Sequence, residues 1–359
     1  HNPCDVLQER LFIPKCTLVP FWSFSLDYQK RGFMNTVFKH LSAAVLLACA
    51  ASAVAADKVT VGVVVKIGGI PWFNAMEEGI KEESDKLGVE AFMIAPTSAD
   101  PALQVRAVED LIARKVDVIG VVPNDAQVLE PVFKRAREQG IKIITHESTN
   151  SQNIDYDFEM ITNQALGEAN AKLFAEKTGC KGSYAVYVGG LSVPGHNAWA
   201  DAAVNYMKTA CPDMKQASER FGVAESVDDS RNTTLDLMRA HPELSGIMSF
   251  GSQGTIGAAR AAEERGVAGK FVSVGIFSPG QGAKLVHQGT IQGGYIWSPL
   301  EAGKAFVALG KMLADGDDIS KKDELPVLGK VKFDGKVIYA DQPLELSTET
   351  VDKLAEIGL

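Results

Sequence analysis

Short, almost wholly apolar segments alternate with amphipathic helical segments along most of this chain. Two examples are Val118-Ile119-Gly120-Val121-Val122 and Ile141-Lys142-Ile143-Ile144. Strands that are apolar on both faces are typical of a parallel sheet covered by helices on both sides. This alternation is the strongest constraint on the fold, and it predicts the α/β class.

The alternation runs through the chain in two successive sets of similar size. The first set predicts strands at 59–65, 90–95, 117–122, 141–146 and 156–161, with helices at 71–87, 101–114, 126–139 and 164–178. The second set predicts strands at 183–188, 217–222, 246–250, 271–276 and 291–297, with helices at 196–209, 228–240, 255–265, 279–287 and 300–314. We therefore expect two doubly wound parallel-sheet domains.

The end of the chain follows a different pattern. Val331 to Ala340 alternates around Asp334-Gly335, which indicates a β-hairpin. A last short helix is predicted to open at Leu346-Ser347, with the Ser347 hydroxyl as its N-cap.

The segment 34–56 has the features of an export signal. From Met34 it shows a short basic lead, an apolar stretch and a small-residue cleavage site at Ala53-Val54-Ala55. We interpret it as a signal peptide that directs the protein to the periplasm, and residues 1–33 as an upstream, non-native segment. The alternative is a lipoprotein box at Leu46-Leu47-Ala48-Cys49, which would anchor the protein to a membrane through Cys49.

Cysteine usage agrees with export. Cys4, Cys16 and Cys49 precede the expected mature chain, which keeps only Cys180 and Cys211. Each of these two cysteines follows a predicted helix, and the two helices flank one strand. In an oxidising compartment we expect a Cys180–Cys211 disulfide; two free thiols are the alternative.

Composition and motif searches argue against several functional classes. The formal net charge of −9, with no run of Lys or Arg, disfavours nucleic acid and anionic membrane surfaces as partners. The chain has no G-x-x-x-x-G-K-[ST] or G-x-S-x-G motif, and Gly280-Gln281-Gly282 lacks the third glycine of a dinucleotide loop. The histidines have no metal-ligand spacing. We therefore expect no enzymatic activity, no cofactor and no metal.

The candidate binding residues follow the predicted strands, because ligands bind at the carboxyl ends of parallel strands. These loops hold three of the four Trp residues of the chain, together with charged and amide side chains. Aromatic faces pack against the C–H faces of sugars, and polar groups bind hydroxyls. For each residue alone, ordinary packing or surface exposure is the alternative. The candidates are Lys66, Trp72, Phe73, Asn74, Asp125, His146, Glu147, His196, Asn197, Trp199, Ser252, Gln253, Phe277 and Trp297.

Three segments carry a family resemblance: Lys66 to Phe73, Val121 to Ala126, and Ser273 to Pro279. Across 57–359 the chain resembles the type I periplasmic solute-binding proteins of sugar ABC importers, above all the autoinducer-2-binding (Lsr-type) and rhamnose-type branch. The resemblance implies two α/β domains joined by a three-segment hinge near 163–164, 298–300 and 330–333. The implied domains are 57–163 plus 299–330, and 164–298 plus 331–359.

The resemblance also bears on the ligand. Ribose-binding relatives carry Asp, Arg and Asn where this chain has Phe277, His196 and Gly251. In autoinducer-2 binders the first strand ends in a Lys, which Lys66 matches, whereas Glu147 replaces their Asp after the fourth strand.

The implied ligand is a small polyhydroxylated molecule, namely a sugar, a polyol or an autoinducer-2-like compound. The implied partner is an ABC permease, and the protein is expected to be a monomer. A sensory role, in which the ligand is presented to a chemoreceptor or sensor kinase, is the alternative. A repressor built on the same core would need an N-terminal helix-turn-helix where this chain has the predicted signal peptide.

Overall fold

The computed structural model describes residues 58–359. The predicted upstream segment 1–33, the predicted signal peptide 34–56 and the possible lipoprotein box at Cys49 lie outside the described residues. Among the helices of 58–359, none is long and apolar enough to cross a membrane.

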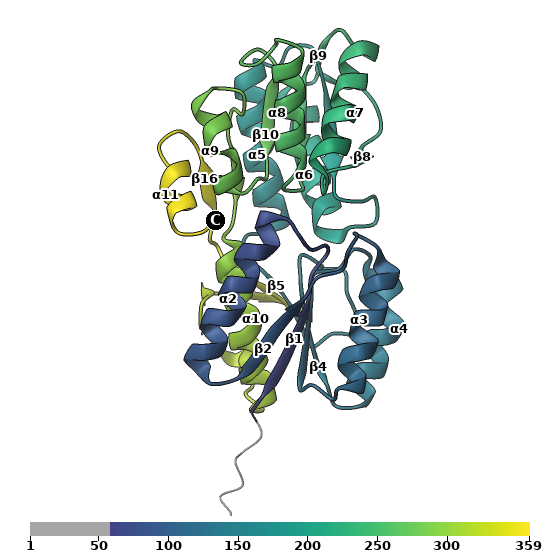
Figure 1. Ribbon diagram of the computed structural model, residues 1–359, viewed down its shortest axis with the longest axis vertical. Coiled ribbons are helices and arrows are strands. Elements are labelled where there is room, and N and C mark those ends of the chain that lie inside the picture. The colour runs from purple at the N-terminus through teal and green to yellow at the C-terminus, as the bar shows by residue number, and fades with distance from the viewer. Residues whose placement is uncertain (1–57) are drawn as a thin grey trace, which may run out of the picture. The chain divides into compact units, whose positions relative to one another are not determined.

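The first lobe is built on a seven-stranded sheet with the order β14-β15-β5-β4-β3-β1-β2 (Figure 1). Its strands are β1 Thr60–Val64, β2 Glu90–Ile94, β3 Val118–Val121, β4 Lys142–His146, β5 Tyr156–Glu159, β14 Lys332–Asp334 and β15 Val337–Tyr339. All neighbours pair in parallel except β14 and β15, which form the predicted hairpin.

Helices cover both faces of this sheet. Helices α2 (Pro71–Leu87) and α10 (Pro299–Ala314) lie on one face, and α3 (Pro101–Ala113) and α4 (Ala126–Glu138) lie on the other. Helices α2 and α10 pack closely because Gly79 of α2 has no side chain. A Cβ at Gly79 would clash with the backbone carbonyl of Leu300 in α10.

The second lobe holds a smaller parallel sheet with the order β10-β9-β6-β7, and β8 also pairs with β6. Its strands are β6 Ser183–Val188, β7 Lys215–Gln216, β8 Phe221–Gly222, β9 Leu244–Ser249 and β10 Val272–Gly275. Its helices are α5 Asn163–Thr178, α6 Pro194–Ala210, α7 Val227–Ala240, α8 Gly254–Glu264 and α9 Pro279–His287. The fold class predicted from the sequence, two parallel-sheet α/β units, is confirmed.

Two predicted strands of this lobe need correction. The strand expected at 217–222 is replaced by β7 and β8, and between them Arg220 pairs with Asp201 of α6. The strand expected at 291–297 is only β11 (Gly294–Ile296), which pairs antiparallel with β16 (Leu344–Leu346).

The C-terminal segment is shared between the lobes, so assigning all of 331–359 to the second domain is wrong. Strand β15 pairs in parallel with β5 of the first sheet, where Ile338 becomes fully buried. The chain then crosses to β16 and α11 (Val351–Glu356), which packs against α9 in the second lobe. A 3-10 turn (Ile319–Lys321) and a small hairpin of β12 (Glu324–Leu325) and β13 (Gly329–Lys330) precede this segment.

The predicted N-cap of the last helix is also wrong. Helix α11 begins at Val351 and follows Thr350. The backbone N–H of Ser347 donates to Thr350 Oγ1 at 3.0 Å, so Ser347 lies in the turn that leads into the helix.

The predicted disulfide joins Cys180 and Cys211, with their Cα atoms 5.2 Å apart. Helix α5 ends at Thr178, where Gly179 takes the left-handed conformation, and helix α6 ends one residue before Cys211. The bridge therefore ties together the carboxyl ends of two adjacent helices, as the sequence predicted.

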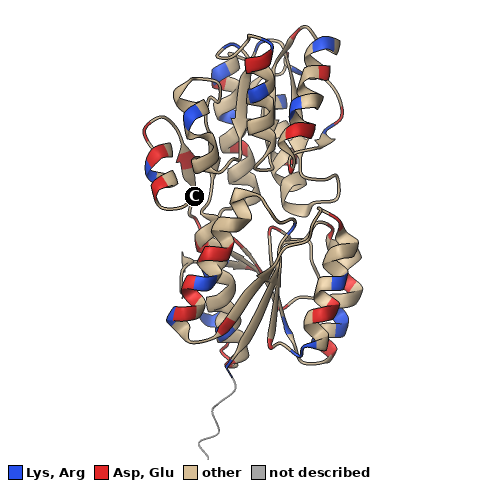
Figure 2. Cartoon of the chain, viewed as in Figure 1, with Lys and Arg blue, Asp and Glu red and all other residues tan. Residues whose placement is uncertain are grey.

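The main apolar core is continuous between the two lobes. It runs from Met76 and Phe306 on one face of the first sheet, through Trp72, Trp297 and Trp199, to the α5 and α6 side of the second sheet. Two smaller clusters lie under α3 and α4 and under α7 and α8. Basic and acidic residues are interspersed along the outer helices, as expected for faces turned to solvent (Figure 2).

Candidate functional site

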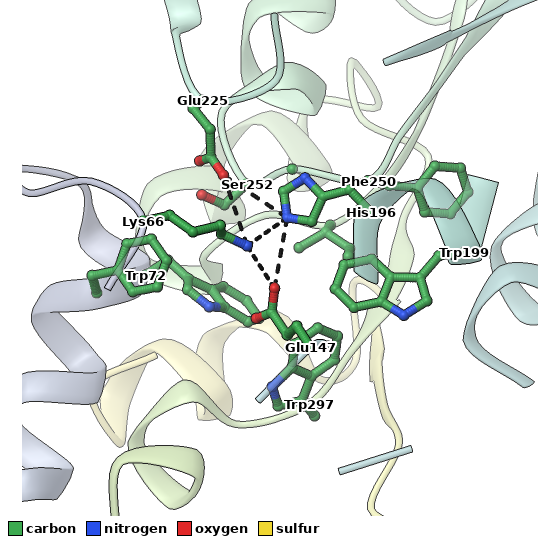
Figure 3. Close-up of a pocket in the computed structure, with 12 residues that line it drawn as sticks. Lys66, Trp72, Glu147, His196, Trp199, Glu225, Phe250, Ser252 and Trp297 are labelled. Carbon is green, nitrogen blue, oxygen red and sulfur yellow. Dashed lines mark hydrogen bonds and ion pairs between the residues drawn. The ribbon is translucent and has the colours of Figure 1, made fainter. Parts of the chain in front are cut away.

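Four ionisable side chains meet where strand ends of the two lobes approach each other (Figure 3). Lys66 follows β1 and Glu147 follows β4 in the first lobe. His196 lies in the first turn of α6, and Glu225 follows β8, in the second lobe. This is the carboxyl edge of both sheets, where the sequence predicted a site.

The cavity at this point has a volume of about 10 Å³, which is room for a single water molecule. A sugar therefore enters only if the walls or the lobes move apart. The lining residues are Lys66, Trp72, Phe73, Glu147, His196, Trp199, Glu225, Phe250, Gly251, Ser252, Ile276 and Trp297.

The Lys66 ammonium lies at the centre of the polar cluster, and its side chain is only 2% exposed. Its Nζ atom lies 2.5 Å from Glu147 Oε2, 2.7 Å from His196 Nε2 and 3.9 Å from Glu225 Oε1. Two carboxylates, one imidazole and one ammonium from two lobes thus share a site with little water. In such surroundings a charge-assisted hydrogen bond is strong.

A buried amide network fixes the backbone around Lys66. The Gln104 amide of α3 donates to the carbonyls of Val65 (3.1 Å) and Val122 (2.8 Å) and accepts from the backbone N–H of Asn124. The Asn124 amide in turn donates to the Lys66 carbonyl at 3.0 Å. These bonds tie the ends of β1 and β3 together and fix the backbone of Lys66.

Glu147 is held by an unusual turn directly after β4. Its φ angle is +60°, a conformation that non-glycine residues seldom adopt. The buried Asp157 on β5 supports this turn, because its Oδ1 accepts from Thr145 Oγ1 at 2.7 Å and from the Ser148 backbone N–H at 3.1 Å. The turn aims the Glu147 carboxylate at Lys66.

The electrostatics of the second-lobe groups reflect their burial. Burial raises the pKa of Glu225 to about 7; Lys66 partly offsets this effect and Glu147 adds to it. Burial and then the Lys66 charge lower the pKa of His196 well below its ordinary value, so its imidazole is neutral near pH 7.

A second pair of acids lies beneath the Glu147 turn. Burial raises the pKa of Asp157 to about 6, although hydrogen bonds from Thr145 and Ser148 lower it in part. The pKa of Glu159, two residues along the same strand, is raised well above its ordinary value by burial and by the charge of Asp157. Neither acid lines the cavity; Asp157 acts as a positioning residue through its hydrogen bonds with Thr145 and Ser148.

Aromatic rings form the walls around the polar centre. Trp297 meets Trp72 edge to face at 5.3 Å and Trp199 at 5.0 Å, while the Phe73 ring lies 5.7 Å from Lys66 Nζ. The indole N–H of Trp199 donates to Asn163 at 2.7 Å, which fixes the orientation of that ring. Such walls suit the C–H faces of a sugar, and the polar centre suits its hydroxyls.

The structure brings eight of the predicted residues together around this cavity. They are Lys66, Trp72, Phe73, Glu147, His196, Trp199, Ser252 and Trp297. Their contact with a ligand stays a prediction.

Two buried residues of the predicted set do not line the cavity and belong to the core. His146 is the last residue of β4; it stacks on Phe158 at 4.4 Å, with its Nδ1 2.7 Å from the Phe158 carbonyl oxygen. Phe277 is fully buried against Gly282, where a Cβ would clash with its ring.

Four polar residues of the predicted set also lie outside the lining. Asn74 is exposed on α2, and Asp125 caps α4 by accepting from the Val128 N–H at 3.0 Å. The Asn197 amide donates to the carbonyls of Gly190 and Val193, and Gln253 bonds to Gln281. Asp125, Asn197 and Gln253 make these hydrogen bonds within their own lobes. The contact of these four residues with a ligand stays a prediction.

Sequence reasoning missed four lining residues: Glu225, Phe250, Gly251 and Ile276. Phe250 and Gly251 stand next to the predicted Ser252 after β9, and Ile276 follows β10. Glu225 could have been found by the same rule, because it comes three residues after β8. Within 58–359 no group of three or more His, Cys, Asp or Glu is arranged to hold a metal ion.

Two α/β lobes whose strand ends enclose a polar, aromatic-walled site define a class of two-lobed ligand-binding proteins. The family model described as "Periplasmic binding protein domain" matches residues 61–318, and the chain belongs to that family. Its members are solute-binding proteins rather than enzymes.

Relatives and solved structures agree with this assignment. The ribose import binding protein of Escherichia coli (strain K12) is 24% identical over 290 residues, covering 79% of this chain and 94% of that protein. The D-allose-binding periplasmic protein of the same organism is 25% identical over 306 residues, covering 80% and 94%.

Among solved structures, a solute-binding protein from Clostridium phytofermentas with bound L-rhamnose has a TM-score of 0.78 at 21% identity, covering 84% of this chain and 99% of that chain. LsrB from Clostridium saccharobutylicum in complex with AI-2 has a TM-score of 0.77 at 18% identity, covering 82% and 99%. These similarities show the fold.

Proposed function

We propose that this chain is the periplasmic solute-binding component of an ABC importer and that it binds a small sugar, polyol or AI-2-like molecule between its lobes. The observation that carries the proposal is the Lys66–Glu147–His196–Glu225 cluster, to which each lobe contributes one acid and one nitrogen group. The names of the relatives, which include ribose and D-allose binding proteins, favour import over the sensory alternative.

The chemistry of the lining supports a neutral, polyhydroxylated ligand. Three Trp and two Phe rings supply apolar faces, while carboxylates, an ammonium, an imidazole and the Ser252 hydroxyl supply hydrogen bonds. Two acids beside one ammonium make an anionic ligand unfavourable. Hydroxyl groups can serve as donor and acceptor, so they suit this mixed set.

The mechanism follows from the division of the site between the lobes. A ligand that contacts both lobes favours the closed arrangement through interactions that an open arrangement cannot offer. Closure then gives a membrane permease one defined surface made from both lobes. We further propose that the predicted signal peptide 34–56 exports the chain and that the protein acts as a monomer.

A thermal-shift screen of the purified chain against pentoses, deoxysugars, linear polyols and AI-2 tests this function. Ligand at 100 times its Kd should raise the melting temperature by about 5 °C. The Lys66→Met variant should respond less, whereas Lys134→Met, at an exposed ion pair of α4, should respond like the parent. If no compound in the panel shifts the parent, the proposed ligand class is wrong.

A further inference from the structure

The contact between Lys66 and His196 brings two hydrogen-bond donors together. The backbone N–H of Gly189 lies 2.9 Å from His196 Nδ1 and can only donate, so Nδ1 must carry the lone pair. A neutral imidazole has a single N–H, which is therefore on Nε2. This Nε2–H faces Lys66 Nζ at 2.7 Å, across the line between the lobes.

The alternative protonation states fit this geometry less well. An imidazolium would carry a proton on Nδ1 as well and would turn it toward the Gly189 N–H. It would also place a second positive charge beside the Lys66 ammonium, and both burial and that charge lower the pKa of His196. An ammonium has three donors and no acceptor, so Lys66 cannot accept from Nε2–H. Both groups need an acceptor.

Two carboxyl groups, those of Glu147 and Glu225, lie on either side of this contact. When ionised, a carboxylate accepts hydrogen bonds and cannot donate. Glu147 Oε2 lies 3.7 Å from His196 Nε2, and Glu225 Oε1 lies 3.8 Å from the same atom. Gly189 leaves room for this arrangement, because a Cβ there would come within 2.8 Å of both His196 Nδ1 and Glu225 Oε1. The site thus presents two converging donors, one from each lobe, flanked by two carboxylates.

We propose that the site recognises three consecutive oxygenated carbons, in an inference that rests on the proposed function. The central oxygen, a hydroxyl or carbonyl, accepts from Lys66 Nζ and from His196 Nε2–H. The hydroxyls on the two neighbouring carbons donate to Glu147 and to Glu225. Since the central oxygen separates two donors that otherwise oppose each other, it also couples lobe closure to the ligand.

The first test reads the tautomer directly. Two-bond ¹H–¹⁵N NMR of the imidazole rings, with His196 assigned by its loss in His196→Phe, should show the neutral Nε2–H form between pH 6 and 8. The variant His287→Phe, which changes an exposed histidine of α9, serves as the control. A neutral Nδ1–H tautomer or an imidazolium at His196 would overturn the inference.

The second test removes single ligand oxygens. Calorimetry should compare D-arabinose with its 2-deoxy analogue, and erythritol with 1,2,4-butanetriol, in the parent and in His196→Phe. For whichever parent compound binds, loss of a hydroxyl should weaken binding at least tenfold, and the loss of the central oxygen should cost less in His196→Phe. If full and deoxy compounds bound equally well, the recognition of three oxygenated carbons would be wrong, while the proposed function would stand. If no sugar or polyol bound at all, both would be wrong.

Discussion

The two lobes equip the shared site in different ways. The first lobe supplies an ion pair, Lys66 and Glu147 at 2.5 Å. Asn124 donates to the Lys66 carbonyl, and Asp157 accepts from the Ser148 N–H next to Glu147. The second lobe supplies a neutral imidazole and the acid Glu225, which lies 3.9 Å from the only ammonium among the lining residues. Under the proposed function, the first lobe binds the ligand through charged groups, whereas the contribution of Glu225 in the second lobe depends on its protonation.

The disulfide sharpens this comparison, because it stabilises the second lobe without taking part in the site. Replacing both cysteines, as Cys180→Ser with Cys211→Ser, should lower the free energy of unfolding in urea by about 3–4 kcal/mol. Cys211 lies at the far end of α6 from His196, so the affinity for ligand should stay within twofold of the parent. A large change in affinity with unchanged stability would contradict this separation.

The first-lobe ion pair should dominate affinity. Charged hydrogen bonds contribute about 1.5–3 kcal/mol each, so Lys66→Met and Glu147→Gln should each weaken binding tenfold or more in calorimetry. The matched control Lys134→Met makes the same chemical change at a surface ion pair with Glu138 in α4 and should bind like the parent. If both site variants bind with the affinity of the parent, Lys66 and Glu147 do not contribute to ligand binding.

The second-lobe acid should make binding depend on pH. Because the pKa of Glu225 is raised to about 7, its carboxylate is available to ligand hydroxyls above that pH and is lost below it. The affinity of the parent should fall severalfold between pH 8 and pH 6, and Glu225→Gln should reduce this ratio.

Other ionisable groups in the site and beneath the Glu147 turn must be separated from Glu225 in this experiment. The pKa of Asp157 is about 6 and that of Glu159 is also raised, so we expect pH dependence that remains in Glu225→Gln to come from these buried acids. His196 stays neutral throughout, beside Lys66 and Glu147. An identical pH ratio in parent and variant would show that Glu225 has no part in binding.

The buried acid Asp157 should make the stability of the first lobe depend on pH. Its pKa in the folded protein, about 6, lies above its ordinary value, so its contribution to stability is complete at low pH and is lost as the pH rises through 6. Asp157→Asn keeps an oxygen that accepts from Thr145 and Ser148 but cannot ionise. The drop in unfolding free energy from pH 5 to pH 8 should shrink by about 1 kcal/mol relative to the parent, whereas the surface variant Asp334→Asn should leave it unchanged.

Most of the fold could be predicted because parallel sheets leave a strong local signal. Buried strands such as Val118–Val121 are apolar on both faces, and helices begin at proline or capping residues. The crossing of the C-terminal segment left no such signal. The sequence of the hairpin 332–339 is compatible with either sheet. Only the observed pairing of β15 with β5 shows that the hairpin belongs to the first sheet.

The site was predictable only to the level of strand ends. His146 and Glu147 are adjacent, yet the positive φ of Glu147 turns one toward the cavity while the other packs on Phe158. Glu225 comes three residues after the end of the strand predicted at 217–222, and the sequence alone does not show that it lies 3.9 Å from Lys66. Side-chain direction after a strand depends on backbone turns and distant partners, which periodicity does not encode.

A crystal structure of the protein with the best ligand from the sugar and polyol panel tests the central claim most directly. The account predicts a ligand enclosed between the lobes, with one oxygen within hydrogen-bond distance of both Lys66 Nζ and His196 Nε2, and with Glu147 and Glu225 accepting from its hydroxyls. A ligand that contacts only one lobe, or that binds away from this cluster, would contradict the account.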